Sequence, residues 1–436
     1  MGTGPERLGV HLKEPIIPGG VNKIQRELTV TAWSGSSQGV SFLKMLKSII
    51  PAEQTSGVVI PSPIAAPASV SGERIVAIDH LRGIAMLLMA VDHSMYFAGV
   101  APVAESYGMK LPELGSLSLV LIGLATNISS GVFFALAGTS VAFFAKSRLN
   151  RGWTQGRISR FLVIRGVLLI ALDAIVEPLG WGAPLTVDTL SALGFCIIVL
   201  AFVRRLPLCI ISISSILLFV LYPILVTSIK PSETTTLEFI LTVLFQFHMG
   251  GPLYVEFPLL ARLSVVFAGF TFGILLQQNR ISISSSYVWI GLAGLAVTFL
   301  LRLGGGYGNF VPYNSDLSAI YFLIENKQPP SIVFLLFNLS LAVLLLAGLN
   351  RFQRSLDRTG IAAVLQLFGQ TSLFFFVAHL LVYGKITRSI THFKYFTDIR
   401  LVAVTEFTAG LVILIPLCML YRWLRNRYPN GLLQYF

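Results

Sequence analysis

Long apolar blocks separated by short polar stretches make up the chain from Ile75 onward. Most blocks hold about 18–25 residues, the length at which an α-helix crosses ~30 Å of hydrocarbon. They lack the short segments of alternating hydrophobicity that are typical of transmembrane β-barrels. The pattern therefore predicts an all-α, polytopic transmembrane helical bundle of about ten spanning helices, at residues 75–97, 117–145, 159–179, 187–203, 207–228, 257–277, 284–303, 329–349, 361–383 and 401–424.

The residues before this region have a different pattern. Residues 1–73 combine scattered Lys and Arg with many Ser, Gly and Pro, and hold no apolar run long enough to span a membrane. Ser41–Ile50 has the pattern of a short basic amphipathic helix on a membrane surface, with a disordered tail as the alternative. Pro61–Ser71 is typical of a linker. We therefore expect a polar, disordered extension over residues 1–73 and a membrane domain over residues 74–436.

Composition agrees with a membrane protein, and the distribution of charge predicts on which side of the membrane the termini lie. The chain is 54% hydrophobic and 12% charged, whereas a soluble domain carries roughly twice that charged fraction. The net charge of +12 comes mostly from basic residues in alternate loops, which predicts that both termini are cytoplasmic; the last outer loop is the exception. Basic residues at helix ends, without a clustered basic patch, predict no nucleic-acid binding. The predicted cytoplasmic loops carry Lys146, Arg148, Arg151, Arg157, Arg160, Arg204, Arg205, Arg280, Arg351, Arg354, Arg358, Arg422, Arg425 and Arg427.

Metal and nucleotide motifs do not stand out in the sequence. Cys196, Cys209 and Cys418 lie inside apolar blocks without the spacing of a metal or redox site. The chain contains no Walker, dinucleotide-binding or zinc-protease pattern. We therefore expect no metal site, and the candidates for chemistry are the polar residues inside the apolar blocks, because such residues are costly in lipid.

The first apolar block is the richest in such residues. Arg82 and His93 are eleven residues apart, so on an α-helix they lie about 20° from the same face and ~16 Å apart along the axis. Asp79 precedes Arg82 by three residues, which allows the two to pair. One helix face thus carries a charged pair at one end and an imidazole at the other. The structural alternatives are an interfacial arginine and a hydrogen-bonded core histidine.

These residues belong to a segment with a family resemblance. Residues 74–97, RIVAIDHLRGIAMLLMAVDHSMYF, resemble the opening signature of membrane acyltransferases similar to heparan-α-glucosaminide N-acetyltransferase. The spacing from Arg82 to His93 is also similar to that of the broader acyltransferase-3 group. Further segments resemble the family in its order: TNISSGVFFALAGTSVAF at 126–143, RGVLLIALDAIVEPLGW at 165–181, DTLSALGFCIIVLAFVRRLP at 188–207, FPLLARLSVVFAGFTFG at 257–273, KQPPSIVFLLFNLSLAVLLLAG at 327–348 and FGQTSLFFFVAHLLV at 368–382.

The resemblance implies transfer of an acyl group, such as acetyl, from cytoplasmic acyl-CoA to a sugar hydroxyl or amine on the outer side. His93 would then be the general base toward the acceptor, with His379 as a second candidate base. Arg82, paired with Asp79, would hold the donor or the developing oxyanion.

Binding roles are expected for five further residues. Asp92, Asn127 and Lys327 are the candidates for contact with the acceptor. Arg160 and Arg165, in or beside a predicted cytoplasmic loop, are the candidates for the CoA phosphates, since arginines commonly bind phosphate. A plain topogenic loop is the alternative for the two arginines.

Departures from the family pattern keep other functions open. The usual histidine, proline and Pro-Trp pair are replaced by Asn127, Gly131 and Ala261-Arg262. Altered acceptor recognition, catalysis by His93 alone and loss of activity remain alternatives, the last as a non-catalytic scaffold. The alternative from another class is a transporter of a lipid-linked sugar or anionic solute, with a pathway lined by Arg82, Arg165 and Arg262.

The cellular setting follows from the same resemblance. We expect a multi-pass protein of the bacterial inner membrane whose partners are membrane lipid and a glycan acceptor. Association into a homo-oligomer stays open.

Overall fold

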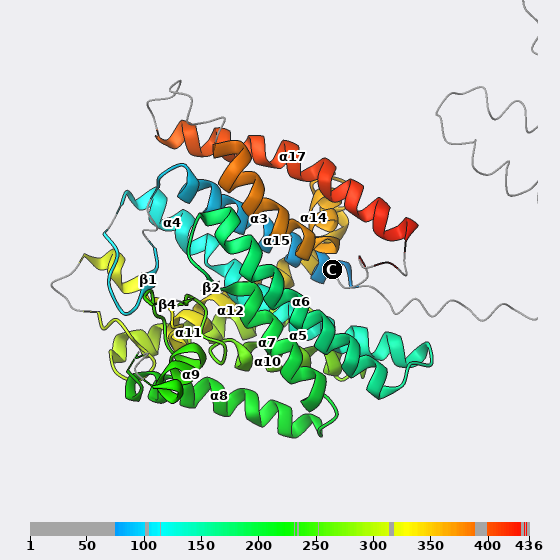
Figure 1. Cartoon of the computed structure of the whole chain (residues 1–436), viewed down its shortest axis with the longest axis horizontal. Helices are drawn as coiled ribbons and strands as arrows, with labels where there is room; N and C mark the ends of the chain where they lie inside the picture. Colours follow the sequence, from blue (N-terminus) through cyan, green and yellow to red (C-terminus); the bar gives the residue numbers. More distant parts are fainter. Residues whose placement is uncertain are drawn as a thin grey trace, which may run out of the picture. The chain divides into compact units, whose positions relative to one another are not determined.

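The computed structural model describes residues 75–433 except 101–103, 114, 231, 233–234, 252, 314–317, 389–398, 429–430 and 432. The extension expected over residues 1–73 lies outside the described residues. Helices account for most of the described chain (Figure 1). They are α3 (Val76–Phe97), α4 (Leu117–Thr126), α5 (Ile128–Asn150), α6 (Gln155–Trp181), α7 (Thr189–Val203), α8 (Leu208–Ser228), α9 (Thr236–Phe245), α10 (Leu263–Gln277), α11 (Tyr287–Gly304), α12 (Ile332–Arg351), α13 (Gln353–Leu356), α14 (Gly360–Gln370), α15 (Ser372–Leu381) and α17 (Ile399–Arg427), with the one-turn segments η1 (Ala319–Leu323) and η2 (Val382–Thr387).

Helix α3 runs through the middle of the bundle, with α17 along one side and α8 along the opposite side (Figure 1). It packs against α5, α12, α14, α15 and α17. The polar face predicted for this helix is therefore turned into protein, where its charges can be paired, and away from lipid.

Glycines allow the closest helix crossings around this centre. A Cβ on Gly138 of α5 would lie 2.0 Å from the carbonyl oxygen of Val266, and one on Gly269 of α10 would lie 1.9 Å from that of Ala135. Small residues at both crossing points let the two backbones touch, as is common between membrane helices. The α5–α10 pair forms a rigid wall beside α3.

The membrane character of the prediction is supported, but the count of ten spans is not. Among the described residues, five helical stretches are long and apolar enough to cross a membrane, or six if the bent pair α14–α15 is one span. Helix α3 carries Asp79, Arg82 and Asp92, and α7 and α10 have only 15 residues each. All ten predicted blocks are nevertheless helical in part. The stretches that qualify are Leu117–Asn150, Leu208–Ser228, Tyr287–Gly304, Ile332–Arg351 and Ile399–Arg427.

Several helix ends differ from the predicted blocks. Helix α10 begins at Leu263, six residues later than expected, and α12 begins at Ile332, after Pro329 and Pro330. The block 361–383 is broken at Thr371 into α14 and α15, which meet at 90°. Helix α9 was not expected at all. Hydropathy alone does not show such breaks, because both halves of a broken helix stay apolar.

Four short strands join the loops at one end of the bundle. Strand β1 (Ser106–Tyr107) pairs in parallel with β4 (Asn326–Gln328), and β2 (Thr186–Val187) pairs in parallel with β3 (Tyr254–Val255). Each pair ties together two loops that are far apart in the sequence. The loops therefore form a fixed frame around the cavity described next.

Candidate active site

A cavity of about 380 Å³ lies under these strand pairs, at the end of α3 that carries His93. Helices α3, α5, α6 and α15 contribute to its walls. Its polar lining is unusually rich in carboxyl groups: Asp92, Glu105, Glu177, Asp188 and Glu256, together with Lys327 and His93. The volume and the mixture of polar groups with the rings of Trp181 and Phe247 suit a small polar ligand.

His93 is hydrogen-bonded to His379 of α15, with 2.8 Å between Nδ1 of His93 and Nε2 of His379. The other ring nitrogen of His379, Nδ1, lies 3.1 Å from the carbonyl oxygen of Phe375 and 2.5 Å from that of Phe376. A carbonyl oxygen only accepts, so Nδ1 of His379 carries a hydrogen and its Nε2 accepts from His93. In the neutral pair, Nε2 of His93 is then the nitrogen with a lone pair.

The ring of His93 is held on a second side by Trp181, whose ring packs edge-on at 4.9 Å between centroids. His93 lines the cavity, and Nε2 is the ring nitrogen that its bond to His379 leaves for a ligand. The two candidate bases of the sequence thus form one unit. His379 is fully buried, so its position suits orientation of His93 better than direct contact with a ligand.

Lys327 brings a positive charge to the same cavity. Its Nζ lies 2.5 Å from Oε2 of Glu105 and 4.0 Å from Oδ2 of Asp92. Burial lowers the pKa of Lys327, but the carboxylates of Glu105 and Asp92 outweigh burial and raise it above the usual value. Lys327 therefore stays charged at neutral pH. Asp92 also accepts a hydrogen bond of 3.0 Å from Oγ1 of Thr126.

Glu256, on the loop between β3 and α10, is a carboxyl of the cavity that titrates near neutral pH, as does Asp188 beside it. Burial raises the pKa of Glu256 to about 7, although the charge of Lys327 lowers it in part. Near neutral pH the residue is therefore present both as acid and as carboxylate. The sequence analysis did not single out Glu256, because it lies outside any motif and is brought to the cavity by the pairing of β2 with β3 and of Val255 with His248.

A buried ion pair places the segment that carries Lys327. Nη1 of Arg302 donates to Oε1 of Glu325 at 2.8 Å, and Arg302 also donates to four nearby backbone carbonyls. Glu325 in turn accepts from the backbone N–H groups of Phe310, Val311 and Asn326. The pair fixes the loop before α12 and so the direction of Lys327. Its two residues are 23 apart without a regular spacing, and the sequence analysis missed it.

Arg262 also helps to hold the segment that carries Lys327. It is fully buried, its guanidinium lies 5.3–5.9 Å from the ring centres of Phe134, Phe257 and Phe334, and Nη2 donates to the carbonyl oxygen of Lys327 at 3.3 Å. Among the described residues, Arg82 and Arg165 line the same two pockets, and the lining of those pockets does not include Arg262.

The other end of α3 carries the predicted charged pair. Nη1 of Arg82 lies 3.2 Å from Oδ1 of Asp79, Nη2 donates to Oγ of Ser140 at 2.8 Å, and Nη1 also donates to the carbonyl oxygen of Gly369 at 3.3 Å. The pairing expected from the three-residue spacing is confirmed. Arg82 thereby links α3, α5 and the break between α14 and α15.

A polar pocket of about 140 Å³ opens beside Arg82. Arg165 of α6 and Arg425 of α17 line it with Arg82, and α15 begins there at Ser372. The first N–H groups of a helix attract anions, as do arginine side chains. Three guanidinium groups and a helix N-terminus give this pocket a geometry suited to an anion, although Arg82 also pairs with Asp79 and Arg425 also donates to the carbonyl oxygen of Gln370. Arg425 was not singled out in the sequence, where it reads as a topogenic residue.

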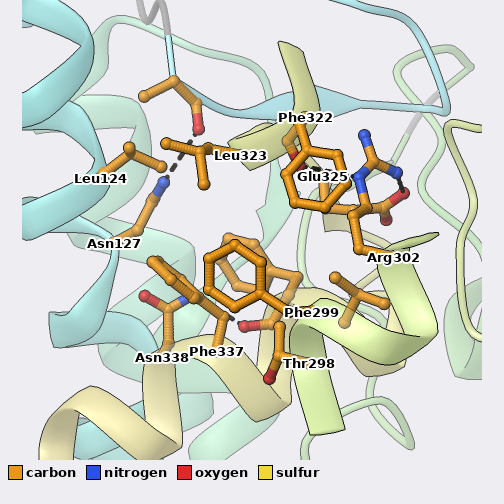
Figure 2. A pocket seen from close by; sticks show the side chains of 13 residues that line it. Leu124, Asn127, Thr298, Phe299, Arg302, Phe322, Leu323, Glu325, Phe337 and Asn338 are labelled. Carbon is orange, nitrogen blue, oxygen red and sulfur yellow. Dashed lines mark hydrogen bonds and ion pairs between the residues drawn. The ribbon is translucent and has the colours of Figure 1, made fainter. Parts of the chain in front are cut away.

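Two predicted binding residues lie away from both cavities. Arg160 is exposed on α6 and lines neither of them. Asn127 donates from Nδ2 to the carbonyl oxygen of Ala104 at 3.2 Å, and its side chain faces a separate pocket between α4, α11 and α12 (Figure 2). That pocket holds about 30 Å³, enough for water-sized groups but not for a sugar ring. Figure 2 shows Asn338, Phe299 and the Arg302–Glu325 pair around it.

The comparison with protein families covers nearly all of the described chain. Residues 75–423 match the family model of an acyltransferase domain, acyltransferase-3. A search of curated proteins gives no match. The family match runs from the start of α3 into α17 and includes the residues that line both cavities except Arg425. The chain therefore belongs to the acyltransferase-3 family and is a membrane acyltransferase.

Proposed function

We propose that the protein transfers an acyl group from acyl-CoA, bound at the arginine pocket, to a sugar hydroxyl or amine bound in the cavity of His93. The observation that carries the proposal is the arrangement of the two sites on one helix. Arg82 and His93 are ~16 Å apart along α3, and each faces its own cavity. The arginines recognise the donor, and the histidine acts on the acceptor.

The donor site is proposed from charge. Arg82, Arg165 and Arg425 surround a pocket of the size of a phosphate-bearing group, and the N-terminus of α15 adds its backbone N–H groups. Phosphates of CoA held there leave its thioester arm free to extend along α3 toward His93. Arg82 is too far from His93 to meet an oxyanion formed beside it, so its position favours donor binding.

The reaction follows from the tautomer of His93. Nε2 of His93 accepts the proton of the acceptor hydroxyl or amine, and the acceptor oxygen or nitrogen attacks the thioester carbonyl carbon. The new carbon–oxygen or carbon–nitrogen bond forms as the carbon–sulfur bond breaks, and the CoA thiolate leaves and takes up a proton. The charged Lys327 and the carboxyl groups around it hold the acceptor's polar groups.

Several narrower features belong to the same proposal. The arginine pocket is the cytoplasmic side and the His93 cavity the outer side, with both termini cytoplasmic as the positive-inside rule predicts. Acetyl is the proposed acyl group, and the resemblance to heparan-α-glucosaminide N-acetyltransferase supports a glycan acceptor. A bacterial inner membrane is the proposed location. A possible second copy of the chain plays no part in this mechanism.

The proposed function can be tested with two arginines of the same helix, α6, one inside the arginine pocket and one outside it. Arg165 lines the arginine pocket, whereas Arg160 is exposed and lines neither cavity. Calorimetry on detergent-purified protein should show saturable acetyl-CoA binding that Arg165→Gln weakens by on the order of tenfold, a typical loss for one charged hydrogen bond. Arg160→Gln should bind as the parent protein does.

His93→Gln separates catalysis from binding. It should keep acetyl-CoA binding and lose acyl transfer by on the order of 10²–10⁴-fold, the usual contribution of a general base. Absence of acetyl-CoA binding to folded protein at millimolar concentration would contradict the proposal. So would acceptor transport into vesicles without a covalent product, which is the behaviour of the transporter alternative.

A further inference from the structure

Phe133 of α5 lies where the two halves of the proposed site meet. Its side chain lines the cavity of His93 and also a narrow pocket of about 80 Å³ on the side of Arg82. The narrow pocket continues into the arginine pocket, because Arg82, Ser140, Arg165, Ser372 and Leu373 line both. Phe133 is thus the lining residue that these two spaces have in common.

Three helices line this route in regular steps. Helix α3 contributes Arg82, Met86, Met89 and His93, each three or four residues after the last, which keeps them on one face. Helix α5 contributes Ser140, Ala137, Phe133 and Ser130 in the opposite direction, and α15 contributes Ser372, Leu373 and Phe376. Helix α6 also lines both spaces, with Arg165 and Leu169 on one side and Glu177 and Trp181 on the other. The same helices therefore wall both cavities, and the side chain of Phe133 lies where the two linings meet.

Phe133 has room to move, unlike its neighbour. Phe134 is fully buried and packs against Phe257 and Arg262. Phe133 is only half-buried, with open volume on both of its sides, and stacks on Phe376 at 5.5 Å between ring centres with 21° between planes. A change of its side-chain rotamer moves the ring without moving the helix.

We propose that Phe133 is a gate that opens for the acyl-bearing arm of the donor and closes between turnovers. This inference rests on the proposed function for the identity of what passes, although the partition itself does not depend on it. A route that stayed open would let small solutes cross the membrane and let water from the His93 cavity reach the thioester. An aromatic ring that turns aside for a narrow chain and then stacks again on Phe376 prevents both.

Accessibility of an introduced cysteine tests the partition directly, since the native Cys196 and Cys418 are buried. Ser130→Cys places a thiol in the His93 cavity, one turn of α5 from Phe133, in a background where the exposed Cys209 is replaced by Ser. Sulfonatoethyl methanethiosulfonate is a small, membrane-impermeant anion that the arginine pocket attracts. Vesicles of both orientations should show modification from the His93 side only, and adding Phe133→Ala should raise the rate from the Arg82 side at least tenfold.

A matched control lies on the same helix. Phe143 of α5 lines none of the three cavities, so Phe143→Ala should leave the labelling unchanged. Equal labelling from the Arg82 side with and without Phe133→Ala would overturn the gate. So would a parent protein that reacts equally from both sides.

A second variant keeps the proposal testable if Phe133→Ala does not fold. Phe133→Trp enlarges the ring, so acyl transfer should fall about tenfold while binding of adenosine 3′,5′-bisphosphate, which lacks the arm, stays as in the parent protein. Unchanged transfer in Phe133→Trp would overturn the gate. A protein that passes the labelling test but transfers no acyl group would refute the proposed function and leave the partition standing.

Discussion

His93 and His379 are 286 residues apart in the sequence and share one hydrogen bond of 2.8 Å. The backbone carbonyls of Phe375 and Phe376 decide which nitrogen of His379 carries hydrogen, and His379 then decides the same for His93. Periodicity within one helix predicted the face that carries Arg82 and His93, and the structure bears out the pairing of Arg82 with Asp79. Periodicity could not predict His379 as the partner of His93, because that contact depends on how two helices far apart in the sequence cross.

The role of His379 as a positioning residue can be measured. His379→Phe removes the acceptor for Nδ1 of His93, so the hydrogen can move to the nitrogen that faces the cavity. We expect kcat to fall on the order of 10- to 100-fold with little change in KM for acetyl-CoA, less than the loss expected for His93→Gln. His379→Gln keeps an acceptor oxygen and should recover part of the rate. Equal activity of all three proteins would show that His379 has no such role.

The carboxyl of Glu256 predicts a pH dependence of stability. Its pKa in the folded protein is about 7, above the ordinary value of 4.5, so folding favours the protonated form. This contribution to stability is fully present below pH 4.5 and is lost as the pH rises through 7. The Tm of purified protein should therefore fall more steeply between pH 5 and 8 than that of Glu256→Gln. Parallel Tm curves for the two proteins would contradict the assignment.

At the scale of elements, the break at Thr371 sets the position of the arginine pocket. Helix α14 packs closely on α3, since a Cβ on Gly369 would lie 2.0 Å from the carbonyl oxygen of Asp79. The chain then turns by 90°, and α15 begins at the pocket. The sequence predicted one span here, because FGQTSLFFFVAHLLV stays apolar through the turn. Packing between two backbones, which hydropathy does not describe, decides where the helix breaks.

A substitution at this contact should weaken acetyl-CoA binding although no charged residue is replaced. Gly369→Ala places a methyl group against backbone, and overpacking of this kind typically costs about 1–3 kcal/mol. We expect a lower Tm and weaker acetyl-CoA binding, because the carbonyl of Gly369 holds Arg82. Gly360→Ala, at the other end of α14 with no atom near its Cβ, should change neither. Equal Tm and binding in both variants would show that the contact is not needed.

At the scale of the whole molecule, the apolar pattern predicted the fold class better than the number of spans. Polar residues such as Asp79, Arg82 and Asp92 keep α3 from being recognised as a membrane span by its composition. The helix nevertheless packs at the centre of the bundle. Helices covered on all sides by protein need not satisfy the rule that governs lipid-facing ones. The apolar pattern also could not predict which loop residues form the site. Glu105, Glu256 and Lys327 meet in one cavity because strand pairs of two or three residues hold their loops together.

Those strand pairs also bear on how acceptor preference can change among related proteins. Ser106–Tyr107 is held by Asn326–Gln328, and Thr186–Val187 by Tyr254–Val255. A loop exchanged alone from another member would lose its backbone partner, whereas two loops exchanged together would keep it. Chimaeras that exchange both loops of a strand pair together are therefore the ones that should keep a folded rim around the cavity.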